Sequence, residues 1–216
     1  MKRLVCLSGM GASKLFSPLF EVVTRADNAR MKLTADDVLL FEGGTDVNPK
    51  YYGQRQGRYT DSPDIVRDAR ERALWLAAQE VGAASIGICR GSQFLTVMND
   101  GELIQHVTGH CQSHRIRTND GGSFEVTSTH HQMMVPLVEH QMLAWSAKPL
   151  SNVYLDGNDV HCPEKVFGWR EPEIVWYPKS KSLCIQGHPE YVDSKEIFPQ
   201  YCLRLVRKFI LSGEKE

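Results

Sequence analysis

The chain has 216 residues, of which 42% are hydrophobic and 24% are charged, and its formal net charge is −1. This length and composition suit one globular domain over residues 1–216, and the balanced charge indicates neither nucleic acid nor an anionic membrane as a partner. Six cysteines without CxxC spacing, no signal peptide and no apolar stretch of membrane-spanning length favour a cytoplasmic protein with free thiols.

Short apolar runs alternate with helical segments in the first half of the chain. Strands are predicted at 4–7, 38–41 and 85–89, and helices within 15–24, over 62–82 and over 91–99. Residues 45–59 are rich in turn formers and aromatic residues, and we interpret them as a loop. The alternation predicts a mostly parallel central sheet with helices on both faces.

The segment 62–82 carries a clear signal for the start of a helix. Ser62 can cap the first turn, Pro63 suits that turn, and Asp64 complements the helix dipole. We expect the helix to run to about Gly82. Apolar residues at helical spacing predict a buried stripe made of Ile65, Ala69, Ala73 and Leu76.

The second half of the chain is expected to add antiparallel strands. Residues 102–170 are interpreted mainly as β-structure and loop. A hairpin is predicted from residues 173–177 and 182–186 around a turn at 178–181, and a last helix over 195–211. The predicted fold class is therefore α/β, with antiparallel additions in the second half.

Cys89 stands where the third predicted strand ends and the next helix begins. Gly87 and Gly91 lie two residues away on either side, and small neighbours allow a sharp strand–turn–helix that lifts one side chain out of the sheet. Near a helix N-terminus the thiolate would be favoured, and the Arg90 N–H would face the oxygen of an attacked carbonyl. A small buried cysteine before a helix fits the same pattern, so partner residues must decide.

His188 and Glu190 are the partners that the sequence offers. Pro189 favours an extended conformation at His188, and residues two apart in an extended segment face the same side. The Glu190 carboxylate could then orient the His188 imidazole, as a thiol nucleophile requires of its base. A surface turn that carries a histidine and a glutamate is the alternative interpretation.

Together, GICRGSQ at 87–93 and GHPE at 187–190 resemble the class I glutamine amidotransferase superfamily, which has a flavodoxin-like fold and a Cys-His-Glu triad. Further stretches are similar to its γ-glutamyl hydrolase branch, peptidase family C26. These stretches are GGTDVNP at 43–49 with YYG at 51–53, Asp64 with Arg67-Asp68, GELIQ at 101–105 and STHHQ at 128–132. The chain departs from the family at Glu42, where proline is usual, at Gly187, where an aromatic residue is usual, and before Val38, where it is shorter or rearranged.

The resemblance implies acyl transfer at a γ-glutamyl carbonyl. Cys89 would be the nucleophile, His188 the general acid and base, and Glu190 its orienter, with a γ-glutamyl thioester as the intermediate. The N–H groups of Arg90 and of the Gly43-Gly44 loop would form the oxyanion hole. Substrate contacts are carried over to Gln93, His130, His131 and Gln132. The substrate would be glutamine or another small γ-glutamyl compound, and the sequence does not name the leaving amine.

Other functions stay open at this point. The chain could be a glutaminase that supplies ammonia to a separate synthetase partner, a catalytically inactive binding module, or another cysteine hydrolase on a related fold. Histidines and a cysteine in HVTGHCQSH at 106–114 could bind zinc, but their spacing matches no common zinc finger, so no metal is expected. No Walker loop or dinucleotide fingerprint occurs, and no cofactor is implied.

Overall fold

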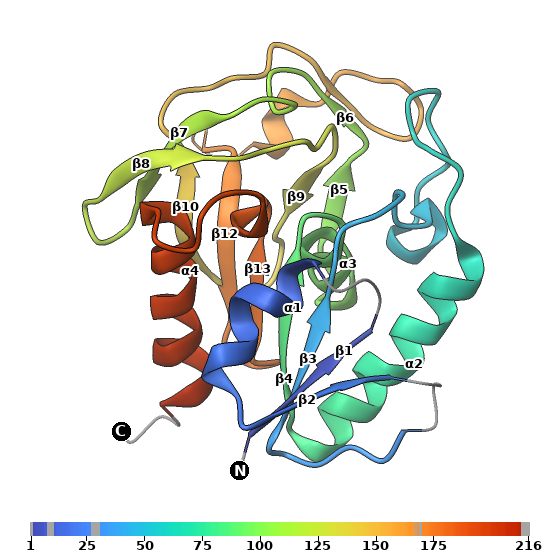
Figure 1. Cartoon of the computed structure of the whole chain (residues 1–216). Coiled ribbons are helices and arrows are strands. Elements are labelled where there is room, and N and C mark those ends of the chain that lie inside the picture. The colour runs from blue at the N-terminus through green and yellow to red at the C-terminus, as the bar shows by residue number, and fades with distance from the viewer. Residues whose placement is uncertain (1, 8–10, 27–30, 167, 169, 213–216) are drawn as a thin grey trace.

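The computed structural model describes residues 2–7, 11–26, 31–166, 168 and 170–212. Within these residues, its centre is a mixed sheet of nine strands in the order β2-β1-β3-β4-β13-β12-β10-β7-β8 (Figure 1). The strands from β2 to β13 in this order pair in parallel. Those from β13 to β8 pair antiparallel. This mixed sheet confirms the predicted fold class.

The parallel part of the sheet contains five strands: β1 (Arg3–Cys6), β2 (Val22–Arg25), β3 (Asp37–Phe41), β4 (Ala84–Ile88) and β13 (Ser182–Ile185). The antiparallel part continues with β12 (Pro172–Tyr177), β10 (Gln141–Ser146), β7 (His114–Thr118) and β8 (Ser123–Val126). Two small pairs lie outside this sheet: β5 (Glu102–Ile104) with β9 (Met133–Val135), and β6 (His106–Val107) with β11 (Tyr154–Leu155). The predicted hairpin is confirmed as β12 and β13.

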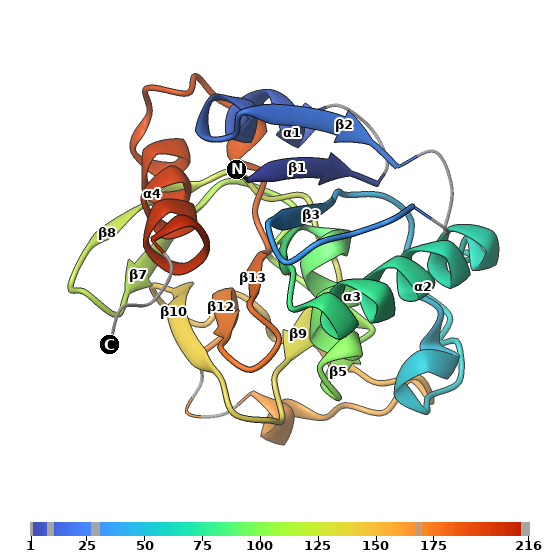
Figure 2. The same ribbon diagram turned by 90° about the horizontal axis from the view of Figure 1, so that it is seen from below.

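Helices cover both faces of the sheet (Figures 1 and 2). They are α1 (Gly11–Phe16), α2 (Ile65–Val81), α3 (Arg90–Met98) and α4 (Ile197–Val206), which continues as a π-helical turn (Arg207–Leu211). Leu4 and Leu40 pack in one hydrophobic cluster with α1 and α4. Val5 and Leu39 pack in a second cluster with α2 and α3. Successive residues of the central strands therefore face opposite layers, as the period of a β-strand requires.

The prediction of the buried face of α2 was wrong. Ile65, Ala69, Ala73 and Leu76 are all exposed, and the buried side chains are Asp68, Glu71, Leu74 and Ala78. Apolar spacing marks the wrong face because α2 turns two carboxylates inward, where arginines from α2 and α3 neutralise them. The helix boundaries were predicted well. Asp64 accepts hydrogen bonds from the N–H groups of Val66 and Arg67, and Gly82 ends the helix with a φ of 72°.

The first forty residues also differ from prediction. The helix expected within 15–24 is α1 (Gly11–Phe16), which a 3₁₀ turn (Ser17–Leu19) follows before the edge strand β2. Strand β2 was not predicted from the sequence, because few of its side chains are buried; Val22 and Val23 are each about 40% exposed. An exposed edge strand shows neither an apolar run nor a strict alternation.

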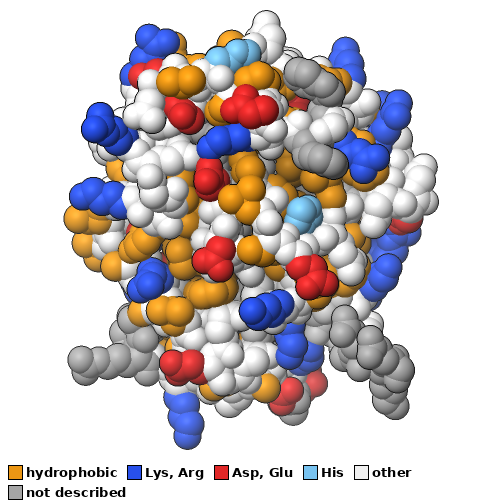
Figure 3. All heavy atoms as spheres, turned by 180° about the vertical axis from the view of Figure 1, so that it is seen from behind, with side chains coloured by type: hydrophobic (Ala, Val, Ile, Leu, Met, Phe, Trp, Pro, Cys, Tyr) orange, Lys and Arg blue, Asp and Glu red, His pale blue; other side chains and the backbone are white. Residues whose placement is uncertain are grey.

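On the face of the molecule opposite to that of Figure 1, acidic and basic side chains are interspersed, in line with the balanced charge of the sequence (Figure 3). Among the described helices, none combines the length and the apolar character that a membrane crossing requires.

Candidate active site

Three neighbouring parallel strands deliver the candidate catalytic segments to one edge of the sheet. The Gly43-Gly44 loop follows β3, Cys89 follows β4, and His188 lies shortly after β13. The three strands are adjacent, in the order β3-β4-β13. The carboxyl ends of adjacent parallel strands meet at one edge, which is the usual site of ligand binding in open α/β sheets.

Cys89 has the backbone of a nucleophile elbow. Its φ is 50° and its ψ is −111°, a combination that a residue with a Cβ rarely adopts. A Cβ on Gly87 would overlap the backbone of Gly91, and a Cβ on Gly91 would overlap the backbone of Phe41. Glycine is therefore required on both sides of the cysteine, which gives the GxCxG pattern a physical reason.

The structure brings Cys89, His188 and Glu190 together. The His188 Nδ1 lies 2.8 Å from the Glu190 Oε1, and the other side of the ring is hydrogen-bonded to the Cys89 thiol. Cys89 is 9% exposed and His188 is 4% exposed, so both reacting groups are largely shielded from bulk water. This is the connectivity of a nucleophile, a base and an orienting carboxylate.

The electrostatics of this site favour a charged imidazole. Burial alone would lower the pKa of His188, but the hydrogen bonds and charges of Cys89 and Glu190 raise it to about 9. The ring of Tyr191 stacks on that of His188, with centroids 4.2 Å apart and planes within 3°. His188 therefore carries a proton at neutral pH and is held in one orientation.

Gly43 lies directly against Cys89 and His188. A Cβ on Gly43 would stand 3.2 Å from the His188 Cε1 and 3.8 Å from the Cys89 Cβ. Arg67 donates hydrogen bonds to the carbonyls of Glu42 (2.8 Å) and Gly43 (3.0 Å). In a trans peptide the N–H points opposite to the C=O, so the N–H groups of Gly43 and Gly44 are directed away from Arg67.

A buried ion network joins this loop to the nucleophile. The Arg90 side chain is 2% exposed and forms ion pairs with Asp68 and Glu71 of α2. Glu71 also pairs with Arg67, at 2.8 Å. Asp68 accepts a hydrogen bond from the Asn48 N–H at 2.9 Å. Sequence reasoning used only the backbone of Arg90. The acidic residues Asp68 and Glu71, three apart on α2, are the sequence signal for this network, whereas at the sequence level Asp68 contributes only to the family resemblance.

Glu42, which the sequence marks only as a departure from the family pattern, is a buried acceptor. It is 6% exposed, and its Oε1 accepts hydrogen bonds from the N–H groups of Ala12 (3.0 Å) and Ser13 (3.4 Å). Burial raises the pKa of the Glu42 carboxyl, and the nearby charge of Glu190 adds to this effect. The carboxyl ties α1 to the loop that carries Gly43.

The second departure, Gly187, also has a structural cause. A Cβ at this position would stand 2.8 Å from the Thr127 carbonyl oxygen and 3.0 Å from the ring of Phe198 in α4. An aromatic side chain has no room there, because Phe198 occupies that side of the strand end.

The residues predicted to contact substrate fall into two groups. Gln93 and Gln132 are buried together, and the Gln93 Nε2 donates to the Gln132 carbonyl at 3.2 Å. The His131 Nε2 lies 3.3 Å from the Asp46 Oδ1, which connects the STHHQ and GGTDVNP segments. His130 is turned elsewhere: its ring lies 4.7 Å from that of His110, within a buried cluster of histidines and glutamates. Its predicted role in substrate binding stays a prediction.

Comparison with known proteins identifies a family. The family model of peptidase C26 matches residues 14–155, which include Cys89 and the Gly43-Gly44 loop but neither His188 nor Glu190. The chain is 32% identical over 190 residues to the glutamine amidotransferase-like protein YvdE of Lactococcus lactis subsp. lactis, an alignment that covers 82% of this chain and 75% of YvdE.

Solved structures share the fold at low sequence identity. A candidate GMP synthase subunit from Thermoplasma acidophilum superposes with a TM-score of 0.61 at 12% identity, over 96% of this chain and 98% of that protein. The glutaminase domain of Trypanosoma brucei CTPS, with bound acivicin, gives a TM-score of 0.57 at 10% identity, over 96% and 93% of the two chains. At these identities the likeness concerns the fold.

Proposed function

The chain belongs to the peptidase C26 family and is glutamine amidotransferase-like, and from this premise we propose that it is a cysteine hydrolase of γ-glutamyl amide bonds. The observation that carries the proposal is the contact of Cys89, on its strained elbow, with a His188 that Glu190 orients. The substrate is a small γ-glutamyl compound or glutamine, and the products are glutamate and an amine or ammonia.

The proposed reaction has two halves. The Cys89 sulfur attacks the γ-carbonyl carbon, and the electron pair of the C=O bond moves onto oxygen. As the tetrahedral intermediate collapses, the C–N bond breaks and the His188 imidazolium gives its proton to the leaving amine. Neutral His188 then takes a proton from water, which attacks the γ-glutamyl thioester and restores the thiolate beside the imidazolium. Each half is an acyl transfer, and neither needs an oxidant or a cofactor.

Backbone N–H groups would stabilise the oxyanion of both intermediates. We assign this role to the N–H of Arg90, which begins helix α3, and to an N–H of the Gly43-Gly44 loop. Arg67 supports this assignment, because it ties back the two carbonyls and so directs the adjoining N–H groups away from itself. The loop donors would then be oriented before substrate binds, as an effective oxyanion hole requires.

Substrate specificity would come from the segments beside the elbow. Both polar atoms of the Gln132 amide are buried without a hydrogen-bond partner among the described residues, and so they are available to the amino-acid end of a substrate. His131 is held by Asp46 at the same end of the sheet. We propose that Gln93 acts with these two residues, through its hydrogen bond to the Gln132 carbonyl.

An ammonia-supplying glutaminase is the second candidate. Its support is the fold shared with a glutaminase domain and with a candidate GMP synthase component. Such a protein would hydrolyse glutamine slowly alone and faster with a separate synthetase partner.

Glutamate release separates the two candidates. The purified chain is incubated with glutamine and with a panel of γ-glutamyl amides, beside a Cys89→Ala control of equal melting temperature. Release from one amide that stops in the control supports the stand-alone hydrolase and identifies its leaving group. If no compound of the panel releases glutamate, the result contradicts the stand-alone hydrolase and favours the glutaminase. Release that persists in the control contradicts both.

A further inference from the structure

A cluster of five buried ionisable side chains lies apart from the triad, on the antiparallel side of the molecule. Its members come from three segments that are distant in sequence: His110, His114, His130, Glu171 and Glu173. None is more than 7% exposed. Buried ionisable groups at this density are costly unless they are paired or bind a metal ion.

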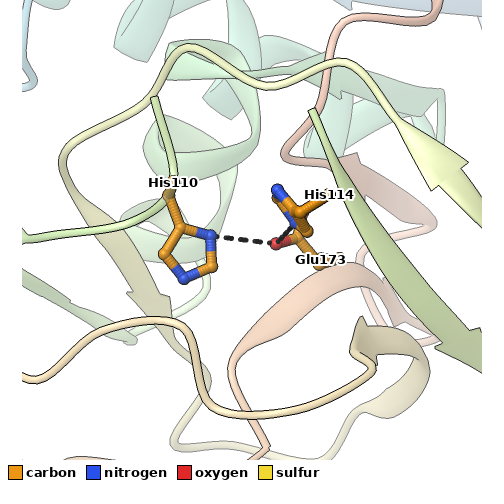
Figure 4. Close-up of side chains that lie close together, drawn as sticks. All are labelled: His110, His114 and Glu173. Carbon is orange, nitrogen blue, oxygen red and sulfur yellow. Dashed lines mark hydrogen bonds and ion pairs between the residues drawn. The ribbon is translucent and has the colours of Figure 1, made fainter. Parts of the chain in front are cut away.

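Three imidazoles converge on one carboxylate oxygen. The Glu173 Oε1 lies 2.8 Å from the His114 Nε2, 3.2 Å from the His110 Nδ1 and 3.9 Å from the His130 Nε2. Figure 4 shows the side chains of His110 and His114 both directed at Glu173. The ligand atoms of these three residues all lie within 4.8 Å of one another.

The opposite nitrogen of two of these rings already has an acceptor. The Nδ1 of His114 lies 3.1 Å from the Gln112 carbonyl oxygen, and that of His130 lies 2.7 Å from the Gln132 carbonyl oxygen. The His110 Nε2 lies 3.2 Å from a Glu171 oxygen. Because a carbonyl can only accept, each Nδ1 of His114 and His130 carries the proton, and each Nε2 is left as the atom that can bind a metal. This is the usual outer arrangement around metal-binding histidines.

Glu171 would support the His110 ring from outside the metal site and would not bind the metal ion itself. Its carboxylate accepts hydrogen bonds from four groups: the Ser146 hydroxyl, the N–H groups of Leu150 and Ser151, and the Tyr154 hydroxyl. Glu173 differs, because its Oε2 is buried without a hydrogen-bond partner among the described residues, and so is the His130 Nε2.

We propose that His110 Nδ1, His114 Nε2, His130 Nε2 and Glu173 bind one divalent transition-metal ion, with zinc as the preferred occupant. Zinc takes four nitrogen and oxygen ligands tetrahedrally at about 2.0–2.1 Å, which places neighbouring ligands about 3.3 Å apart. The separations of 2.8, 3.2 and 3.9 Å bracket this value. One divalent cation also balances the two buried carboxylates while all three imidazoles stay neutral.

The site would be structural, because protein atoms fill its four positions and leave none for a substrate. His130 immediately precedes His131 and Gln132 in the chain. A metal ion at His130 would therefore fix the segment that we propose to contact the substrate, without taking part in the reaction. The sequence alone favours no metal, because the ligand spacing matches no finger and because Glu173 lies 59 residues from His114.

Metal content tests this proposal independently of activity. The full chain is stripped with a chelator, dialysed against zinc and passed through a desalting column, and its zinc is then measured by mass spectrometry. The wild type and a His140→Gln control, altered outside the cluster, should each retain one zinc ion per chain. His114→Gln and His130→Gln should retain none, and Glu171→Gln should bind zinc about 10–100-fold more weakly.

Cobalt provides a readout that does not depend on the folding of a variant. Titration of the stripped wild type with Co²⁺ should give the intense visible absorption bands of a tetrahedral site. The band intensity should stop rising at one equivalent of Co²⁺, and the bands should disappear when zinc is added. A folded wild type that retains no zinc and gives no such bands would overturn the proposal, and the cluster would then be a network held by protons. Equal zinc in His140→Gln and His130→Gln would overturn it as well.

Discussion

At the scale of single residues, three side chains of the candidate site set one another's orientation and charge. Cys89 occupies a strained backbone that two glycines make room for, and His188 fills the space between the sulfur and Glu190. The proposed reactivity of Cys89 depends on its contact with His188, and the proton affinity of His188 depends on Cys89 and Glu190.

Glu190 fixes the tautomer and the orientation of His188, so a neutral amide in its place should be costly. We expect Glu190→Gln to lower kcat/KM about 10³–10⁴-fold, because an amide nitrogen facing the Nδ1 favours the wrong tautomer. Steady-state glutamate release is the measurement. An unchanged KM and melting temperature would assign the loss to catalysis, whereas activity within tenfold of wild type would contradict the orienting role.

The raised pKa of His188 predicts a dependence of stability on pH. Because the folded pKa of about 9 lies above the ordinary 6.5, the favourable interactions are fully present below pH 6.5 and are lost as the pH rises through 9. The difference in unfolding free energy between the wild type and His188→Asn should therefore shrink from pH 6.5 to pH 9, by up to about 3 kcal/mol. Urea denaturation at several pH values measures it, and a difference that grows with pH would contradict the assignment.

At the scale of secondary-structure elements, α2 contacts both segments of the proposed oxyanion hole. Arg67 holds the loop after β3, and the carboxylates of Asp68 and Glu71 hold Arg90, which follows the nucleophile. The buried carboxylates of α2 therefore hold the arginines that position the segments around Cys89.

Removal of one partner from this buried network should be strongly destabilising. We expect Arg90→Met to cost about 3–5 kcal/mol of unfolding free energy, because it removes the arginine that pairs with Asp68 and leaves Glu71 paired with Arg67 alone. Arg72→Met, on the exposed side of the same helix, is the matched control and should change stability by less than about 0.5 kcal/mol. Equal stability of the two variants in urea would show that the network contributes nothing.

Gln105 illustrates how a family motif can serve the fold. Its side-chain oxygen accepts hydrogen bonds from the Gly57 N–H and the Thr60 hydroxyl, and its Nε2 donates to the Gln54 side-chain Oε1 and to the Arg55 backbone carbonyl. It thereby fixes the loop of residues 54–60, which carries no regular secondary structure. The GELIQ stretch supported the resemblance at the sequence level, but its spacing gave no indication of this contact.

At the scale of the whole molecule, the sheet changes from parallel to antiparallel pairing immediately beyond β13. The parallel half supplies the elbow and the glycine loop, and the antiparallel half supplies the STHHQ segment and the histidine cluster. The candidate active site therefore lies where the two halves of the sheet meet.

Local patterns predicted most of this architecture. The apolar runs at β3 and β4, the caps of α2 and the β12–β13 hairpin were readable, because each depends on residues that are close in sequence. The face of α2 and the Glu173 cluster were not readable, because they depend on partners that only the folded chain brings together. The triad was predictable through the elbow glycines and Pro189, which act locally, and through a family resemblance.

The central claim is that Cys89, among six cysteines, is the nucleophile. Labelling with acivicin, an electrophilic glutamine analogue, followed by peptide mapping tests it most directly, since Cys111 is an exposed thiol that competes for any unselective reagent. We expect one adduct per chain, on the Cys89 peptide, which forms more slowly in the presence of glutamine and does not form in Cys89→Ala. An adduct on Cys111, or equal labelling of the Cys89→Ala protein, would contradict it.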